Sequence, residues 1–195
     1  MKSKTIANIF LPMVAAFLTM ALALPAAAQQ VKMTVSGTAT GIGGVLQPDS
    51  NPSNADDHLA GTGPLGSFTF RLINAEPNSP SSSSTCSGAN KLYLQVTTGG
   101  GVFRFQDNSL LYVRLTGGSD CIDFSALQAL CIRVLQITGG TGRFKHASGE
   151  LTLTETVIPV LFDVSGTQPI LSAVTGGITG SINGVREEQD QDEGQ

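Results

Sequence analysis

Apolar and polar residues alternate along most of the chain between residues 31 and 185. The alternation is clear at Val31–Val35 and returns at Phe68–Leu72, Leu92–Val96, Leu111–Leu115 and Leu151–Val157. A period of two places successive side chains on opposite faces of a β-strand. The pattern predicts eight strands, at about 31–40, 66–73, 91–97, 101–106, 109–116, 131–138, 149–158 and 174–185, with 159–164 extending the seventh or forming a short ninth.

Thr-Gly-Gly sequences separate several of these runs, at 98–100, 116–118, 138–140 and 175–177. Glycine accepts positive φ without steric cost, so these sequences indicate tight reversals between antiparallel strands. Many short strands with one apolar face predict an all-β fold. We expect an eight-stranded antiparallel barrel, because closure of the sheet leaves no unpaired edge strand. A β-sandwich is the alternative.

Three segments interrupt the strand pattern. Residues 41–65 and 74–90 are rich in Gly, Pro, Ser and Asn, which predicts two long loops on the outside of the domain. Asp123–Leu130 is the one candidate helix, with Asp123 as its cap and a one-sided apolar face. It would be a turn or two long, placed as a lid or plug at a barrel mouth.

Residues 1–28 have the pattern of a secretory signal peptide. Lys2 and Lys4 precede an apolar run at Ile9–Leu24, and Ala26–Ala28 supplies a small-residue cleavage pattern before Gln29. An uncleaved membrane anchor is the alternative, but the run is short for a membrane span. We therefore predict a secreted or periplasmic protein with no membrane span after signal cleavage, one barrel domain at 29–186 and an acidic disordered tail at 187–195.

The charged residues and histidines argue against several classes of site. The chain holds 11 Lys and Arg residues with no basic patch, so we expect no nucleic-acid partner. His58 and His146 stand outside any cluster with the spacing of metal ligands, so no metal site is predicted. The Gly-rich stretch at 139–145 has Lys145 where a dinucleotide-binding loop needs its third glycine, so no cofactor is predicted.

The three cysteines, Cys86, Cys121 and Cys131, predict a disulfide because an exported protein folds in an oxidising compartment. Three pairings are possible from the sequence. We favour Cys121–Cys131, since both flank one connecting segment and would staple its ends, leaving Cys86 free.

No catalytic residue is assigned, because the chain has no nucleophile elbow and we expect His58, in a polar loop, and His146, in a turn, to be surface histidines rather than bases. One acid is suggestive. Glu155 shares the parity of Leu151, Leu153 and Val157, so a regular strand would aim it into the barrel. An inward carboxyl group in an apolar lumen would have a raised pKa and could transfer protons. The alternatives are that it lies at the solvated end of its strand, or that a bulge turns it outward.

The stretch ITGGTGRFKHASGELTLTETVIPVLF at 137–162 resembles a segment of allene oxide cyclases, with a related turn in dirigent proteins and in exported bacterial proteins described as allene-oxide-cyclase-barrel-like. The matching residues are Ile137, Thr138, Gly139, Gly140, Gly142, Phe144, Gly149 and Pro159. The resemblance implies an eight-stranded antiparallel barrel. It carries no activity over, because the cyclase's catalytic motifs are not found here and a shared fold is poor evidence of shared chemistry. In this segment we expect Phe144 to be a buried anchor and Gly140 and Gly142 to serve the backbone.

The hypothesis for function is therefore an exported β-barrel that acts as a non-catalytic binding or surface-associated module, with a small apolar ligand as its partner. The alternative is a small-molecule isomerase or cyclase that works in the barrel lumen, and a carbohydrate-directed surface protein is a third possibility. A simple binder predicts an apolar lumen with few polar groups. An enzyme predicts polar groups that converge with shifted pKa values. The ligand-binding residues and the oligomeric state are left open.

Overall fold

The computed structural model describes residues 28–42, 46, 54–75 and 79–186. The predicted signal peptide, up to Ala27, and the predicted acidic tail lie outside the described residues. The strands are β1 (Gln29–Ile42), β2 (Asn54–Gly63), β3 (Gly66–Ala75), β4 (Lys91–Gln95), β5 (Thr98–Phe105), β6 (Leu110–Asp123), β7 (Gln128–Gly140), β8 (Ser148–Phe162) and β9 (Pro169–Asn183). A short 3₁₀ helix, η2 (Gly142–Phe144), joins β7 to β8.

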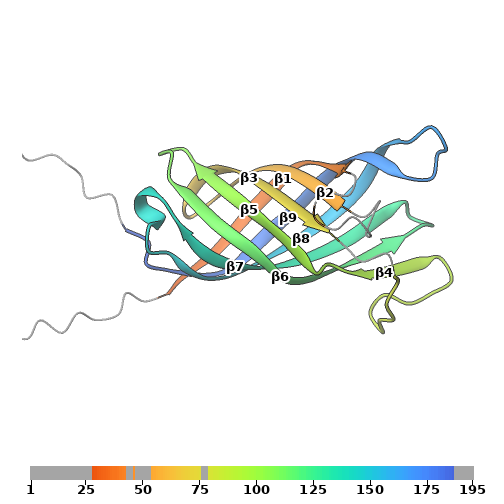
Figure 1. The fold of residues 1–195 in the computed structure, drawn as a ribbon, viewed down its shortest axis with the longest axis horizontal. Coiled ribbons are helices and arrows are strands. Elements are labelled where there is room, and N and C mark those ends of the chain that lie inside the picture. The colour runs from red at the N-terminus through yellow and green to blue at the C-terminus, as the bar shows by residue number, and fades with distance from the viewer. Residues whose placement is uncertain (1–27, 43–45, 47–53, 76–78, 187–195) are drawn as a thin grey trace, which may run out of the picture.

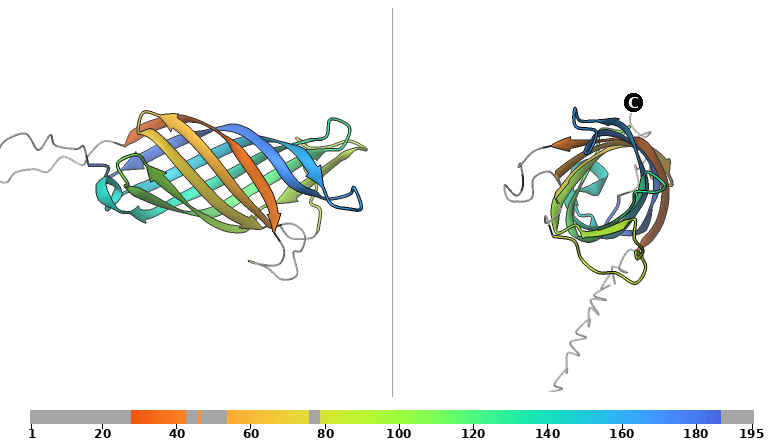
Figure 2. Two further views of the ribbon diagram at one scale, coloured as in Figure 1. Left: turned by 90° about the horizontal axis from the view of Figure 1, so that it is seen from above. Right: turned by 90° about the vertical axis from the view of Figure 1, so that its right-hand side faces the viewer.

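Eight of these strands form a closed antiparallel barrel, which confirms the predicted fold class. The order around the wall is β6-β5-β3-β2-β1-β9-β8-β7, and pairing of β6 with β7 closes the ring. Figure 2 shows this ring end-on and the slant of the strands from the side. β4 is an additional strand that pairs with the last residues of β6, beyond the stretch of β6 that pairs with β5.

One end of the barrel is filled by an apolar core. Phe70 and Phe103 stack with ring centroids 3.9 Å apart, and Phe105 lies 4.6 Å from Phe144. Phe144 is carried on η2, and it is completely buried. Figure 1 shows η2 and both ends of the described chain at this closed end. The predicted role of Phe144 as a buried anchor is thus confirmed.

Two glycines beside this anchor are required by the backbone, as predicted. Gly142 has φ of +58°, a conformation that side-chain-bearing residues rarely adopt. A Cβ atom at Gly140 would lie 2.1 Å from the carbonyl oxygen of Leu110 and 2.8 Å from the Cβ atom of Phe144. Both positions therefore exclude larger residues for steric reasons.

The structure corrects three predictions. The four Thr-Gly-Gly sequences, expected at reversals between strands, lie within β5, β6, β7 and β9. Residues 54–63, expected to be part of a long loop, form the barrel strand β2. The expected helix at Asp123–Leu130 is instead the last residue of β6, a hairpin turn at 124–127 and the first residues of β7. Asp123 does accept hydrogen bonds from the backbone N–H groups of Ser125 and Ala126, at 2.9 and 3.0 Å, but they stabilise a turn. The predicted extension of the 149–158 strand past Pro159 is confirmed, because β8 continues to Phe162.

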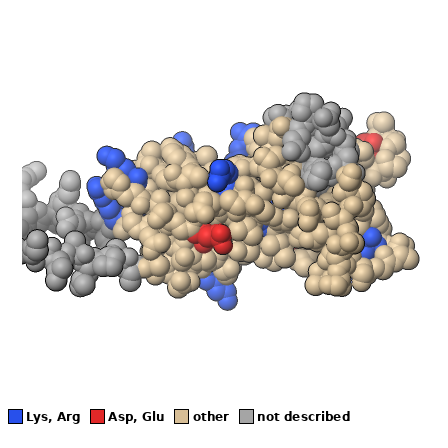
Figure 3. Space-filling model, turned by 60° about the horizontal axis from the view of Figure 1, so that its bottom comes forward, with Lys and Arg blue, Asp and Glu red and all other residues tan. Residues whose placement is uncertain are grey.

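Charged side chains are few and scattered over the part of the barrel wall seen in Figure 3. Within the described ranges, no helix has both the length and the apolar character needed to cross a membrane.

Candidate functional site

The barrel is hollow at the end opposite η2. A cavity of about 430 Å³ lies there, between the ends of six barrel strands and β4. Its walls are largely apolar, with side chains that include Ala39, Leu94, Ile122, Ala129, Val157 and Pro159. The β6–β7 and β8–β9 hairpins extend at this end (Figure 1) and contribute Phe124, Leu127 and Phe162 to the cavity.

Four ionisable side chains lie inside the barrel, where the cavity meets the apolar core. We call Asp57, Asp120, Arg133 and Glu155 the luminal polar layer. They come from β2, β6, β7 and β8, and each is at most 6 % exposed. All four line the cavity. Since they stand on four different strands, only closure of the barrel brings them together.

Two members of the layer form a buried ion pair. Nη1 of Arg133 donates to Oδ1 of Asp120, and Nη2 donates to Oδ2 at 2.9 Å. Nη1 also lies within hydrogen-bond distance of the backbone carbonyl oxygens of Ser119 and Ile132, at 3.3 and 3.2 Å. A bidentate contact of this kind fixes the orientation of the guanidinium group. The charge of Arg133 is therefore matched by Asp120.

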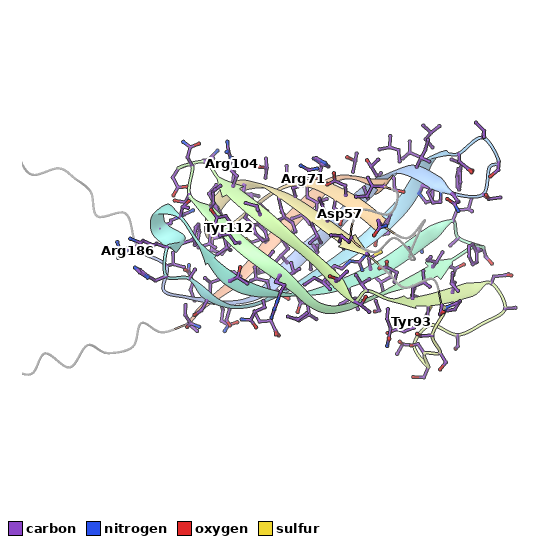
Figure 4. The ribbon with its side chains drawn as sticks, in the orientation of Figure 1. Asp57, Arg71, Tyr93, Arg104, Tyr112 and Arg186 are labelled. Carbon is purple, nitrogen blue, oxygen red and sulfur yellow. A yellow bond between two sulfur atoms is a disulfide. The ribbon has the colours of Figure 1, made fainter. Side chains whose placement is uncertain are left out.

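Asp57 is 4 % exposed and accepts one hydrogen bond, from the side-chain amide of Asn74 on β3 at 3.0 Å. Figure 4 labels Asp57, together with Arg71 of the neighbouring strand, which instead binds Asp56 on the outer face. Burial raises the pKa of Asp57 to about 6; repulsion from Asp120 and Asp56 adds to this effect, while Arg133 opposes it.

Glu155 is 2 % exposed, and its Oε1 atom has no hydrogen-bond partner among the described residues. Burial is the main cause that raises the pKa of Glu155 to about 8, and repulsion from Asp57 and Asp120 adds to it. At neutral pH the group therefore holds a proton. The predicted inward orientation of Glu155 is confirmed, and the alternatives of a solvated strand end or an outward bulge are wrong.

The disulfide differs from the prediction. Cys121 pairs with Cys86, at a Cα–Cα distance of 5.6 Å, and Cys131 is free and buried. The predicted Cys121–Cys131 pairing is wrong because a register shift between Leu115 and Gly117 changes the parity of β6. Beyond that shift Asp120 faces the lumen opposite Cys131, while Cys121 is opposite Leu130 and faces outward. Burial raises the pKa of the Cys131 thiol well above its ordinary value, so it is a poor nucleophile.

The two histidines lie away from the lumen. His58 is 55 % exposed and lies 3.2 Å from Asp56 on the outer face of β2, and His146 is exposed in the turn after η2. Over the described parts of the chain, no group of three or more His, Cys, Asp and Glu side chains is arranged to hold a metal ion.

The sequence analysis found one member of the polar layer, Glu155, and missed the other three. Asp57 was missed because it lies in the 41–65 segment, which the sequence analysis assigned to a loop. Arg133 carried an available signal, because it shares the parity of Leu135 and Ile137 in the predicted 131–138 strand. Asp120 lies past the register shift, where parity counted from Leu111 fails.

Comparison of the chain with protein-family models, with curated proteins and with solved structures gave no match in any of the three. The resemblance to allene oxide cyclases implies a closed eight-stranded antiparallel barrel, and the structure has this barrel. The structure supports no other part of the resemblance.

Proposed function

We propose that this protein is an exported barrel that binds a small molecule in its open half, with the apolar body of the ligand toward the mouth and its polar group toward Glu155. The observation that carries the proposal is a cavity of ligand size that ends on a buried carboxyl group with an unpartnered oxygen. Small-molecule sites are typically concave and apolar with a few convergent polar groups. This proposal modifies the expectation of a purely apolar ligand, since the lumen holds more polar groups than such a ligand needs.

The mouth of the cavity suits the entry of an apolar body. The two hairpins beside it expose apolar side chains to solvent, among them Phe124, Leu127, Val160 and Val164. Exposed apolar groups around a cavity are characteristic of ligand-binding grooves. Export is supported by the signal-peptide pattern of residues 1–28 and is compatible with the Cys86–Cys121 disulfide.

The test is retention of small molecules from native extract, read by mass spectrometry of the repurified protein. The wild-type protein should retain a compound that an Ala129→Trp variant, with an indole inside the cavity, does not. Ala60→Trp is the matched control, because Ala60 lies on the exposed face of β2. Equal retention by all three proteins would place the binding outside the lumen and contradict the proposal.

A second candidate function, a small-molecule isomerase or cyclase acting in the lumen, is favoured by one specific observation. Glu155 lines the cavity with an oxygen that has no hydrogen-bond partner among the described residues, and burial raises its pKa to about 8. A group of this kind can give a proton to a bound substrate and take one back. If this function is right, the wild-type protein should exchange hydrogens of the retained compound with deuterated water. The Glu155→Gln variant should still bind the compound without this exchange. If the wild-type protein catalyses no exchange, binding is left as the function.

A further inference from the structure

The polar layer holds more acids than it can neutralise. Three carboxyl groups, of Asp57, Asp120 and Glu155, face one guanidinium, that of Arg133. Since Arg133 is bonded through both terminal nitrogens to Asp120, its charge is already matched. Asp57 and Glu155 are left as excess carboxyl groups, and among the described residues Asp57 has a hydrogen-bond donor, the amide of Asn74, whereas Oε1 of Glu155 has none.

The groups that surround Glu155 do not supply the missing cation. On β7 the register places Cys131 opposite Glu155, and on β9 it places Gly176 there. Asp57 and Asp120 raise the pKa of Glu155, and Arg133, which lowers it, is bonded to Asp120. A further acid among the described residues that line the cavity, Asp123 at the mouth, is paired with Lys91 at 3.7 Å.

We propose that the ligand of this lumen is an amine, bound as its ammonium ion against Glu155 and Asp57 with an apolar body directed toward the mouth. This inference rests on the proposed function, because it names the ligand class for the same cavity. An ammonium group has three donors and one positive charge, so it supplies both the hydrogen bond that Oε1 of Glu155 lacks and the charge that the layer lacks. The apolar walls at Ile122, Val157 and Pro159 would hold the body.

The same electrostatics act against other ligand classes. A carboxylate would meet two further acids, and although Nε of Arg133 has no hydrogen-bond partner among the described residues, both terminal nitrogens of that guanidinium are bonded to Asp120, so the carboxylate would bind only with protons. A neutral alcohol would gain hydrogen bonds without the attraction between charges. Binding of an amine should also compete with the proton on Glu155. Its affinity should therefore rise as the pH increases from about 6 to about 9, through the pKa of that group.

The test compares three probes with one skeleton, phenylbutylamine, phenylbutanol and phenylbutyrate, by isothermal titration calorimetry of the full exported protein. We expect the amine to bind at least about tenfold more tightly than the alcohol, and the carboxylate most weakly. Glu155→Gln should remove most of this preference and the rise in amine affinity with pH, while alcohol binding stays nearly unchanged. Glu150→Gln is the matched control, since Glu150 is on the exposed face of the same strand. Asp57→Asn gives an independent second test, with a smaller loss of amine affinity.

The outcomes separate this inference from the proposal on which it rests. If the alcohol or the carboxylate binds as tightly as the amine, or if Glu155→Gln leaves amine affinity unchanged, the amine is the wrong class while luminal binding stands. If none of the three probes binds and no compound is retained from extract, luminal binding itself is contradicted.

Discussion

Replacing Glu155 by Gln should make the stability of the protein less dependent on pH. The pKa of Glu155 rises from an ordinary value of 4.5 to about 8 in the folded protein. Between these values the folded state binds the proton and the unfolded state does not, so the free energy of unfolding falls as the pH rises. A tenfold change in proton affinity corresponds to about 1.4 kcal/mol, so the free energy of unfolding falls by about 5 kcal/mol at most.

Gln is uncharged at every pH and has nearly the shape of a protonated Glu. Near pH 4.5 we therefore expect the variant and the wild type to have similar stabilities, within about 1–2 kcal/mol. Near pH 9 the variant should be more stable, by up to about 5 kcal/mol, because it no longer has to bury a carboxylate. The measurement is urea-induced unfolding of both proteins across this range of pH, followed by far-UV circular dichroism.

The difference between variant and wild type reports on Glu155 together with the change that its removal causes in the pKa of Asp57, since all other titrating groups are common to both proteins. Glu150→Gln removes a carboxyl group from the exposed face of the same strand and should give a difference that changes little with pH. A Glu155→Gln difference that is equally constant from pH 4.5 to 9, or a variant that becomes relatively less stable as the pH rises, would refute the argument that Glu155 is buried without a counter-charge.

Three further predictions concern the scaffold. Phe144→Ala should reduce the free energy of unfolding by roughly 3–5 kcal/mol because the ring is fully buried. Phe124→Ala, at a side chain that is 56 % exposed, should change the free energy of unfolding little. Chemical denaturation measures both variants. Reduction of the Cys86–Cys121 disulfide should cost roughly 2–4 kcal/mol, and non-reducing peptide mapping should recover these two cysteines in one linked peptide. The intact mass of the exported protein should correspond to a chain that begins at or near Gln29. A mass that includes the N-terminal methionine would contradict export through signal cleavage.

The apolar half of the barrel could be predicted from the sequence, and the polar half only in part, at Glu155. Along β3, β5 and the first part of β6, the buried inward positions hold Phe, Leu and Val, so that a period of two stands out. In β2 the inward position 57 is an aspartate, flanked by Asp56 and His58 on the outer face, and no apolar period remains. The strand was missed because it carries part of the site.

The error at the cysteines has a physical cause as well. Strand parity can be counted along a chain only until a register shift, and the shift between Leu115 and Gly117 reverses which residues of β6 face the lumen. It turns Asp120 inward and Cys121 outward, toward the segment that carries Cys86. Glu155 was oriented correctly because the register of β8 is regular from Gly149 to Pro159.

The central claim is that the open half of the barrel is a binding site with Glu155 at its floor. The most direct test is a crystal structure of the protein with phenylbutylamine. We predict that the amine nitrogen lies within hydrogen-bond distance of Glu155 and that the phenyl ring contacts the apolar wall near Val157 and Pro159. A lumen filled by repacked side chains, or a ligand bound only on the outer wall while the cavity holds none, would contradict the claim.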